Sequence, residues 1–562
     1  MMAYYCKTLT GLKNNVVLRE DKEQAPTITS KCIDHLGLVA AAIDRLGIVQ
    51  QIDQRIPVNK AKGAQLTHGQ RVKAMILNGL GYVRAPLYMT SRFFENKSLP
   101  SLLGADVECS ALNDQALGRT LDVLDKYGTT RLFGEIAINI AQSQGLLGHS
   151  LHLDTTSLVL YGNYEQVTPF DTTTPAYGHS KAHRNDLKQM VMSMTANGPA
   201  GIPVWFEALP GNSSDKKSFH ETIAVFEDFR QSMAVSDDFI WVADSALWNE
   251  SKLQKAQYNW LTRIPNQVNA VKDLLALEDD EIGWQKLDEN YSCAQYINLQ
   301  EDGEQVWTLY YSKHQRNEAF NTLTRKIGKA FDKAKTESKK LANKEFDCET
   351  DARKDAEQWQ AKLPFHRAEF KIEAIKQHKK RGRPTKNAQP ILKYQICATV
   401  YEDESKIAPH KRKLGRFVLA TNDVNGVGRS AKRMLSSYKE QDKVERGFAF
   451  CKTDEFQLDH IFLKMPSRIN ALMMIMALTL LVYNSSEYQM RAQMKANGET
   501  LPNQLGQEIE TPTLRWVFQI LQGIHVVSGP HIGHCITGMT ELKERAIRLF
   551  GTAACKIYGI KP

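Results

Sequence analysis

Three carboxylates occupy unusual positions in this sequence. Asp154 lies inside the apolar stretch 151–160, and Asp244 lies near the end of another, 239–245. Glu445 stands midway between Tyr438 and Lys452, seven residues from each. An unpaired carboxylate inside a strand is costly unless it faces a cleft and meets a metal. Hard cations such as Mg²⁺ prefer carboxylate ligands, so these residues suit metal-assisted chemistry on phosphate esters.

The spacing around Glu445 predicts a single helix over 438–452. Seven residues make almost two turns, so Tyr438, Glu445 and Lys452 share one face with a drift of about 20° per step. Gln441 borders that face, three residues after Tyr438. By itself this stripe also fits a solvated helix surface. The apolar residues beside it that would anchor the helix to a core are Val444, Phe448 and Cys451.

The other two acids lie within a predicted run of strands and helices. Asp154 is placed in the middle of the first strand, and Asp244 at the end of a later one. Taken singly, Asp154 also fits an edge-strand residue and Asp244 a helix N-cap. Their joint order, followed by the Glu445 helix, is the order of ribonuclease H-like folds. Strands are predicted at 151–160, 190–196, 201–209, 239–245 and 260–264, with helices near 219–229 and 249–258.

Together these features resemble the DDE transposases of bacterial insertion sequences. In one subgroup, the helix bearing the last acid carries Tyr, Arg, Glu and Lys at this spacing. Tyr438, Glu445 and Lys452 match that pattern, whereas Gln441 stands where the Arg would be. The resemblance spans nearly the whole chain. Further segments that resemble this family are 177–181, 186–189, 209–215, 243–247 and 415–422.

The resemblance implies a cut-and-paste transposase with a two-metal site. Asp154, Asp244 and Glu445 would converge and hold two Mg²⁺ ions, for which Mn²⁺ would substitute. One ion would activate water or the DNA 3′-hydroxyl, and the other would stabilise the leaving oxygen. Two alternatives stay open: a metal-dependent DNA nuclease on the same fold, and an inactive, domesticated DNA-binding copy.

The resemblance also implies partners and DNA contacts. Tyr438 and Lys452 would contact backbone phosphates, with Gln441 at the position of a third DNA contact. The expected partners are the terminal inverted repeats and target DNA, with a homodimer in the synaptic complex and no membrane. The expected location is the bacterial cytoplasm, at the nucleoid when DNA is bound.

The predicted fold class is α/β, with a ribonuclease H-like mixed sheet, an α+β insertion and a helical N-terminal domain. The N-terminal domain, 1–145, fits either a packing or dimerisation domain or a module that binds DNA ends. Asn113 is its clearest predicted N-cap, before an apolar stripe that contains Leu117, Leu121 and Leu124. The first part of the catalytic core occupies 146–268, and its last part lies with the C-terminal helices in 426–562. The insertion occupies 269–425.

The insertion is predicted to contain a hairpin at 295–312, a basic helix at 313–345 and strands at 391–401 and 416–421. Its sharpest motif is Gly382-Arg383-Pro384, flanked by basic residues that include Arg381. This is the core of an AT-hook, an extended arm that places Arg in a narrow A·T minor groove. A flexible basic linker that contacts phosphates is the equal alternative. Either one assigns Arg381 and Arg383 to DNA binding.

Composition agrees with a multidomain DNA-binding protein. The chain has 562 residues and a formal net charge of +9, which permits nucleic-acid binding without requiring it. Its nine cysteines lack close pairs at zinc spacing, which favours reduced thiols. No signal-peptide pattern begins the chain. The longest apolar run, 471–483, is shorter than a bilayer-spanning helix and favours a buried one.

Overall fold

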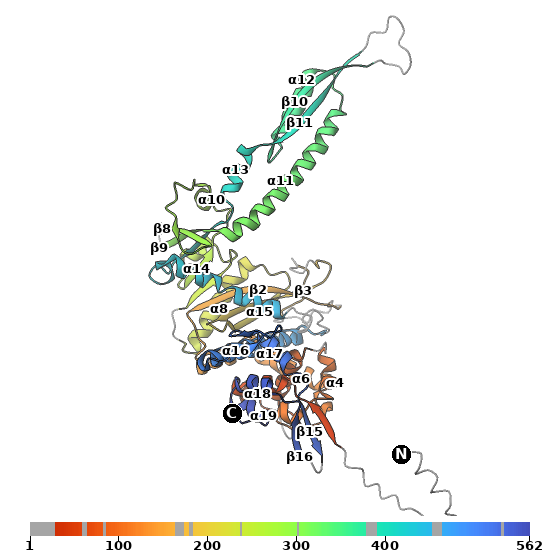
Figure 1. Ribbon diagram of the computed structural model, residues 1–562, viewed down its shortest axis with the longest axis vertical. Coiled ribbons are helices and arrows are strands. Elements are labelled where there is room, and N and C mark those ends of the chain that lie inside the picture. Colours follow the sequence, from red (N-terminus) through yellow and green to blue (C-terminus); the bar gives the residue numbers. More distant parts are fainter. Residues whose placement is uncertain are drawn as a thin grey trace, which may run out of the picture. The chain divides into compact units, whose positions relative to one another are not determined.

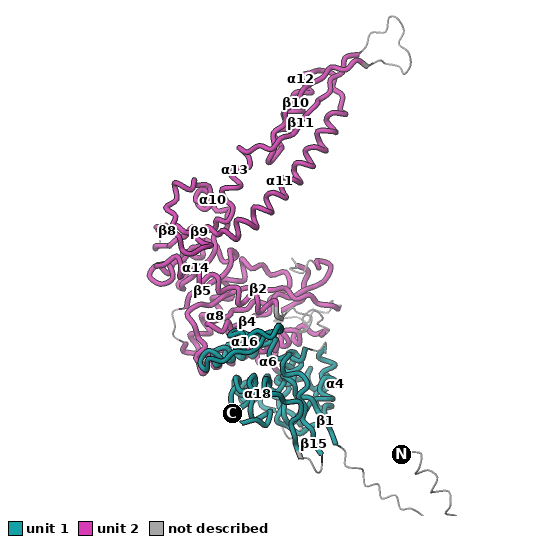
Figure 2. The backbone as a smooth tube through the Cα atoms, viewed as in Figure 1, with its two compact units in different colours: residues 1–123, 482–562 teal, residues 124–481 magenta. Residues whose placement is uncertain are grey.

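The computed structural model describes residues 28–58, 64–82, 86–162, 164, 173–178, 184–235, 239–300, 303–377, 391–451, 463–529 and 533–561. These residues form two compact units (Figure 2). The first combines 1–123 with 482–562, and the second contains 124–481. The units are defined by contacts, so the functional boundaries predicted at 145, 268 and 425 stay predictions.

The second unit is built on a nine-stranded sheet in the order β4-β3-β2-β5-β6-β12-β9-β8-β7. Figure 1 labels its strands β2, β3, β8 and β9. Strands β2, β3 and β4 are antiparallel neighbours, and β5 and β6 continue from β2 in parallel. Three antiparallel strands beside two parallel ones, in this order, define the ribonuclease H-like core, so the predicted fold class is confirmed. The core strands are β2 (Ser150–Val159), β3 (Gln189–Asn197), β4 (Ile202–Pro210), β5 (Ile240–Ala243) and β6 (Asn259–Arg263).

Both faces of the sheet are buried at the central strand β5, as parallel strands require. Alternate residues of a strand point to opposite faces. Trp241 accordingly packs with residues of α7 (Thr129–Ser143) and α8 (Asp215–Ser232), whereas Val242 packs with Met434 and Leu435 of α14 (Ala431–Lys439). The run of apolar residues in β5 is therefore explained by a core on each side.

The remaining strands extend the sheet beyond the predicted core. β12 (Arg416–Thr421) pairs antiparallel with both β6 and β9 (Gly303–Ser312), and β9 pairs with β8 (Tyr291–Gln300). The hairpin and the strand predicted inside the insertion are therefore real, but they belong to the main sheet. The short strand β7 (Gln285–Lys286) ends it.

The projecting part of the insertion begins with α11 (Lys313–Ala342). It continues through α12 (Glu349–Ala361), β10 (His366–Gln377), β11 (Ile391–Glu402) and α13 (Glu404–Arg412). β10 and β11 pair antiparallel, and Trp359, Ala334 and Ala368 form part of a small core beside them. The predicted basic helix and the strand at 391–401 are confirmed. The basic arm with Arg381 and Arg383 lies outside the described residues.

The first unit is mainly helical, as predicted for the N-terminal region. Its predicted N-cap is confirmed, because Asn113 Oδ1 accepts a hydrogen bond from Ala116 N. Leu117, Leu121 and Leu124 of the following helix are fully buried. Its helices include α1 (Leu36–Arg45), α2 (Ile48–Arg55), α3 (His68–Gly79), α4 (Thr90–Phe94), α5 (Leu99–Leu103), α6 (Asp114–Tyr127), α17 (Leu514–Ile520), α18 (Glu541–Arg548) and α19 (Thr552–Ile557).

A small sheet that the sequence analysis missed joins the two ends of this unit. β1 (Thr29–Cys32) pairs antiparallel with β15 (His525–Gly529), which pairs with β16 (Gly533–Thr537). The predicted N-terminal domain therefore shares one compact unit with the C-terminal helices. Because β1 and β15 are about 500 residues apart along the chain, no local sequence pattern predicts their pairing.

The apolar run predicted as a buried helix lies in α16 (Pro466–Asn497). By length and composition this helix is long and apolar enough to cross a membrane, the one such helix among the described residues. However, 83% of its most apolar window is buried inside the protein. Burial in a core therefore accounts for its composition.

Candidate active site

Asp154 and Asp244 come together through the pairing of β2 and β5. These strands are parallel, with Leu151 opposite Trp241 and His152 opposite Val242. Continuing that register by two residues brings Asp154 opposite Asp244, the residue after β5. Neighbouring strands lie about 4.8 Å apart, so this register makes the two residues backbone neighbours on one face of the sheet where β5 ends.

Both acids belong to the sheet face that α14 and α15 (Asp442–Cys451) cover. Residues two apart in a strand share a face. His152, two residues before Asp154, has its Nε2 atom 3.8 Å from the Glu440 carboxylate, in the connection between α14 and α15. Val242, two residues before Asp244, packs on α14. The helices that follow the sheet in sequence therefore lie over the row of acids.

Hydrogen bonds to the backbone hold both aspartates. Asp154 Oδ1 accepts from Thr155 N at 2.7 Å, and Asp244 Oδ1 accepts from Ala246 N at 2.9 Å. The Asp244 carbonyl accepts from Thr262 Oγ1 of β6 at 2.7 Å. Both side chains are half-buried. The turn after β5 is thus fixed in a form that keeps Asp244 at the strand end.

The prediction of a single helix over 438–452 is wrong, because two helices occupy this region. α14 ends at Lys439 and α15 begins at Asp442. In the turn between them, Gln441 N donates to the Tyr438 carbonyl. α14 packs on β5, β6 and β8, whereas α15 packs on β2 and β3, with Val444 and Phe448 buried. Covering different strands requires the change of direction, so Tyr438 and Glu445 do not share one helix face.

Tyr438 nevertheless lies within electrostatic reach of the acids. Burial raises the pKa of its hydroxyl to about 12, and the negative charges of Asp244 and Glu445 act in the same direction. The positive charge of Arg263 opposes them. The phenol therefore stays protonated at neutral pH and remains a hydrogen-bond donor beside the carboxylates. Glu445 itself is exposed, on the first turn of α15.

Arg263 is a charged neighbour of the acids that the sequence analysis missed. β5 and β6 are parallel with Ala243 opposite Thr262, so the next position aligns Asp244 with Arg263. Its guanidinium lies 5.3 Å from the ring centre of Phe417, on the α14 side of the sheet. Asp154, Asp244 and Arg263 thus form one row across three parallel strands. No local pattern marked it, because Arg263 aligns with Asp244 only once β5 and β6 pair.

The structure does not place the other predicted DNA contacts in an open position beside the acids. Gln441 is buried, with 5% of its surface exposed, so its amide does not present an open contact. Lys452 lies outside the described residues, as do Arg381 and Arg383.

The donor chemistry fits a hard divalent cation, although the ligands are not gathered as a set. Adjacent carboxylates from two strands are the oxygen ligands that Mg²⁺ takes. Among the described residues, however, no group of three His, Cys, Asp or Glu side chains is arranged to hold a metal.

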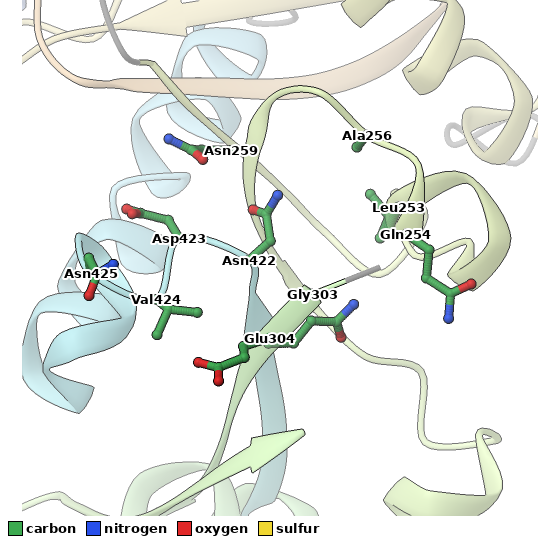
Figure 3. Close-up of a pocket in the computed structure, with 11 residues that line it drawn as sticks. Leu253, Gln254, Ala256, Asn259, Gly303, Glu304, Asn422, Asp423, Val424 and Asn425 are labelled. Atoms are coloured by element: carbon green, nitrogen blue, oxygen red, sulfur yellow. The ribbon is translucent and has the colours of Figure 1, made fainter. Parts of the chain in front are cut away.

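A polar pocket of about 500 Å³ lies elsewhere on the same sheet (Figure 3). Asn259 at the start of β6 and Glu304 near the start of β9 line it, together with Asn425 after β12. Because β5 and β6 are parallel, the start of β6 lies at the opposite end from Asp244. This pocket is therefore separate from the carboxylates.

Residues 28–138 match a family model described as a domain of unknown function, DUF4277. No curated protein matches the chain. The chain is similar to a cryo-EM structure of the piggyBac transposase synaptic complex with hairpin DNA, at 9% identity, covering 84% of this chain and 78% of that chain with a TM-score of 0.35. At that TM-score the likeness carries no weight, so the fold assignment depends on strand order alone.

Proposed function

We propose that this chain is a DDE transposase that cleaves DNA at the ends of an insertion sequence and joins those ends to target DNA. The observation that carries the proposal is the alignment of Asp154 with Asp244 on adjacent parallel strands of a ribonuclease H-like sheet. Glu445, on a helix packed against β2, supplies the third carboxylate. The Tyr, Glu and Lys spacing around Glu445 independently favours the same family.

In this proposal the three carboxylates would hold two Mg²⁺ ions. When bound, the ions supply activation of water or of a DNA 3′-hydroxyl and stabilisation of the leaving oxygen. The protonated Tyr438 hydroxyl donates a hydrogen bond to a phosphate oxygen of the DNA. Arg263, aligned with Asp244, offsets part of the charge that the acids and the phosphate bring together. Lys452 is assigned a phosphate contact by the family resemblance.

One carboxylate site serves both chemical steps, and no covalent link between protein and DNA is needed. Hydrolysis frees a DNA 3′-hydroxyl, and that hydroxyl then attacks a target phosphodiester while the target 3′-oxygen leaves. A nuclease on this fold would perform the first step only. An inactive DNA-binding protein would perform neither.

The test uses the full chain with duplex DNA from both flanks of its gene, a target plasmid and Mg²⁺. We expect nicked ends and joined products from the wild type, and neither from Asp244→Asn. Asp280→Asn serves as the matched control, because it removes one negative charge from an exposed surface position of the same unit. Cleavage without joining would identify the nuclease instead. Binding without cleavage, in Mg²⁺ and in Mn²⁺, would identify the inactive binding protein.

A further inference from the structure

Two arginines of the first unit are brought together where α3 meets α6. His68 Nδ1 of α3 lies 3.2 Å from Thr120 Oγ1 of α6, which joins the two helices at this point. Arg71 follows His68 by three residues and so lies on the same face of α3. Arg119 directly precedes Thr120. Burial lowers the pKa of the Arg71 guanidinium, and the positive charge of the nearby Arg119 lowers it further.

Nothing in the described part of the chain neutralises this pair. Neither guanidinium forms an ion pair there, and Arg119 Nε donates only to the Gln115 carbonyl. The Nε atom of Arg71 is buried without a hydrogen-bond partner. The negative charge of Asp53 interacts with His68, not with the arginines. The Asp53 Oδ1 atom accepts a hydrogen bond from Gly69 N at the start of α3. Two like charges and an unsatisfied donor are costly to hold together without an anion.

We propose that Arg71 and Arg119 form a binding site for a phosphate of the DNA backbone. A phosphate accepts paired hydrogen bonds from guanidinium groups and offsets the repulsion between them. Arg119 is exposed, so the site opens at the surface of the unit, where a long polyanion has access. The site lies within the matched domain of unknown function.

This site rests on the proposed function, because that function supplies DNA as the partner. It extends the proposed function by assigning to the helical unit a contact with the DNA backbone that does not depend on the base sequence. A phosphate contact positions the protein on DNA without reading its bases. The site is thus distinct in role from the carboxylates and can be tested while they are inactive.

The experiment measures DNA binding by fluorescence anisotropy, in EDTA, over a series of salt concentrations. The full chain is titrated into labelled duplexes of A·T-rich and G·C-rich sequence. For Arg119→Gln we expect roughly tenfold weaker binding on both duplexes and a salt slope smaller by about 1, the signature of one lost phosphate contact. The control Lys495→Ala removes one charge from an exposed position of the same unit and should change neither. An Arg119→Gln slope equal to that of Lys495→Ala overturns the proposal.

Thermal unfolding separates binding from a structural role. Without DNA, Arg119→Gln should unfold at the same temperature as the wild type or higher, because it relieves repulsion with Arg71. Weaker binding together with a lower unfolding temperature overturns the proposal in favour of a structural arginine. A third arm adds inorganic phosphate: stabilisation through Arg119 by phosphate alone, with unchanged DNA affinity, overturns the assignment to DNA. EDTA prevents cleavage, so a failure of the proposed transposase chemistry leaves this result readable.

Discussion

Tyr438 and Glu445 lie on different helices, α14 and α15, yet the Glu445 carboxylate adds to the effect of burial, which raises the pKa of the Tyr438 hydroxyl. Tyr438 is also acted on by Asp244, which belongs to the sheet beneath. The Tyr438 hydroxyl is therefore affected by the charge of an acid beside β5 and by the charge of the acid on α15.

Replacing this tyrosine tests whether its hydroxyl assists the reaction. Tyr438→Phe keeps the ring that packs beside the α14 core and removes only the donor. A hydrogen bond to a charged group is worth about 1.5–3 kcal/mol, so cleavage should fall roughly 10- to 100-fold while folding is retained. Because the pKa is about 12, the wild-type rate should show no tyrosine titration below pH 10. Single-turnover cleavage measured from pH 7 to pH 10 checks both statements; an unchanged rate in Tyr438→Phe removes the hydroxyl from the mechanism.

Gln441 offers a test of how far the family pattern applies. The subgroup carries Arg at this position, but the Gln441 side chain is buried in the turn between α14 and α15. Gln441→Arg should therefore destabilise the fold, by roughly 1–3 kcal/mol, since it buries a charge or forces the turn to open. Urea unfolding measures the effect, with the exposed Ser436→Arg as control. A gain in DNA affinity at unchanged stability would show that the turn accepts the family's arginine.

The stability of the first unit should depend on the protonation of His35. Its Nε2 donates to the Leu80 carbonyl at 2.8 Å, and its Nδ1 lies 3.1 Å from Gln522 Nε2, which donates to it. Burial lowers its pKa to about 4. Between about pH 4 and the ordinary value near 6.5 the unfolded chain binds more protons, so stability falls as the pH is lowered through this range.

The matching measurement compares the wild type with His35→Gln by urea unfolding at pH 7, 6 and 5. The stability advantage of the wild type should shrink on acidification, by at most about 1.4 kcal/mol per pH unit. Other titrating groups are common to both proteins and cancel in the difference. A difference that stays constant with pH would mean that His35 does not titrate in this range.

Arg383 tests the two interpretations of the basic arm. An AT-hook places arginine in a narrow minor groove, where the negative potential is concentrated. Arg383→Ala should then weaken binding most on A·T-rich duplexes. Equal losses on A·T-rich and G·C-rich DNA, in the same anisotropy assay, would instead identify a linker that contacts only phosphates.

The parts of the fold with strong local patterns could be predicted from sequence. Apolar runs around Asp154 and Asp244 marked strands, and the order of elements was sufficient to predict the five core strands of the sheet, although not its extension by β12, β9, β8 and β7. The break before Glu445 could not be predicted, because it follows from packing α14 and α15 on different strands, a tertiary constraint that overrides helix periodicity. The pairing of β1 with β15 joins segments far apart in sequence, and Arg263 acquires its position only when β5 and β6 align.

Glu445 provides the test that separates an enzyme from a DNA-binding protein. Glu445→Gln is nearly isosteric, and Gln and Glu have similar helix propensity, so α15 should persist. The change removes one negative charge from the proposed metal site, and Mg²⁺ should be held less well. DNA binding should be retained, because its affinity comes mainly from basic contacts elsewhere.

Cleavage and strand transfer should therefore be lost together in Glu445→Gln, since one set of carboxylates serves both steps. Gel assays of binding, nicking and joining on the element's own ends measure the three activities separately, with Asp280→Asn as the charge-matched control. Retained nicking with lost joining would divide the two steps between different sites. Nicking at the wild-type rate would remove Glu445 from the mechanism and leave Asp154 and Asp244 without their third carboxylate. Loss of all three activities, with a lower unfolding temperature, would instead show that Glu445 supports the packing of α15 on the sheet.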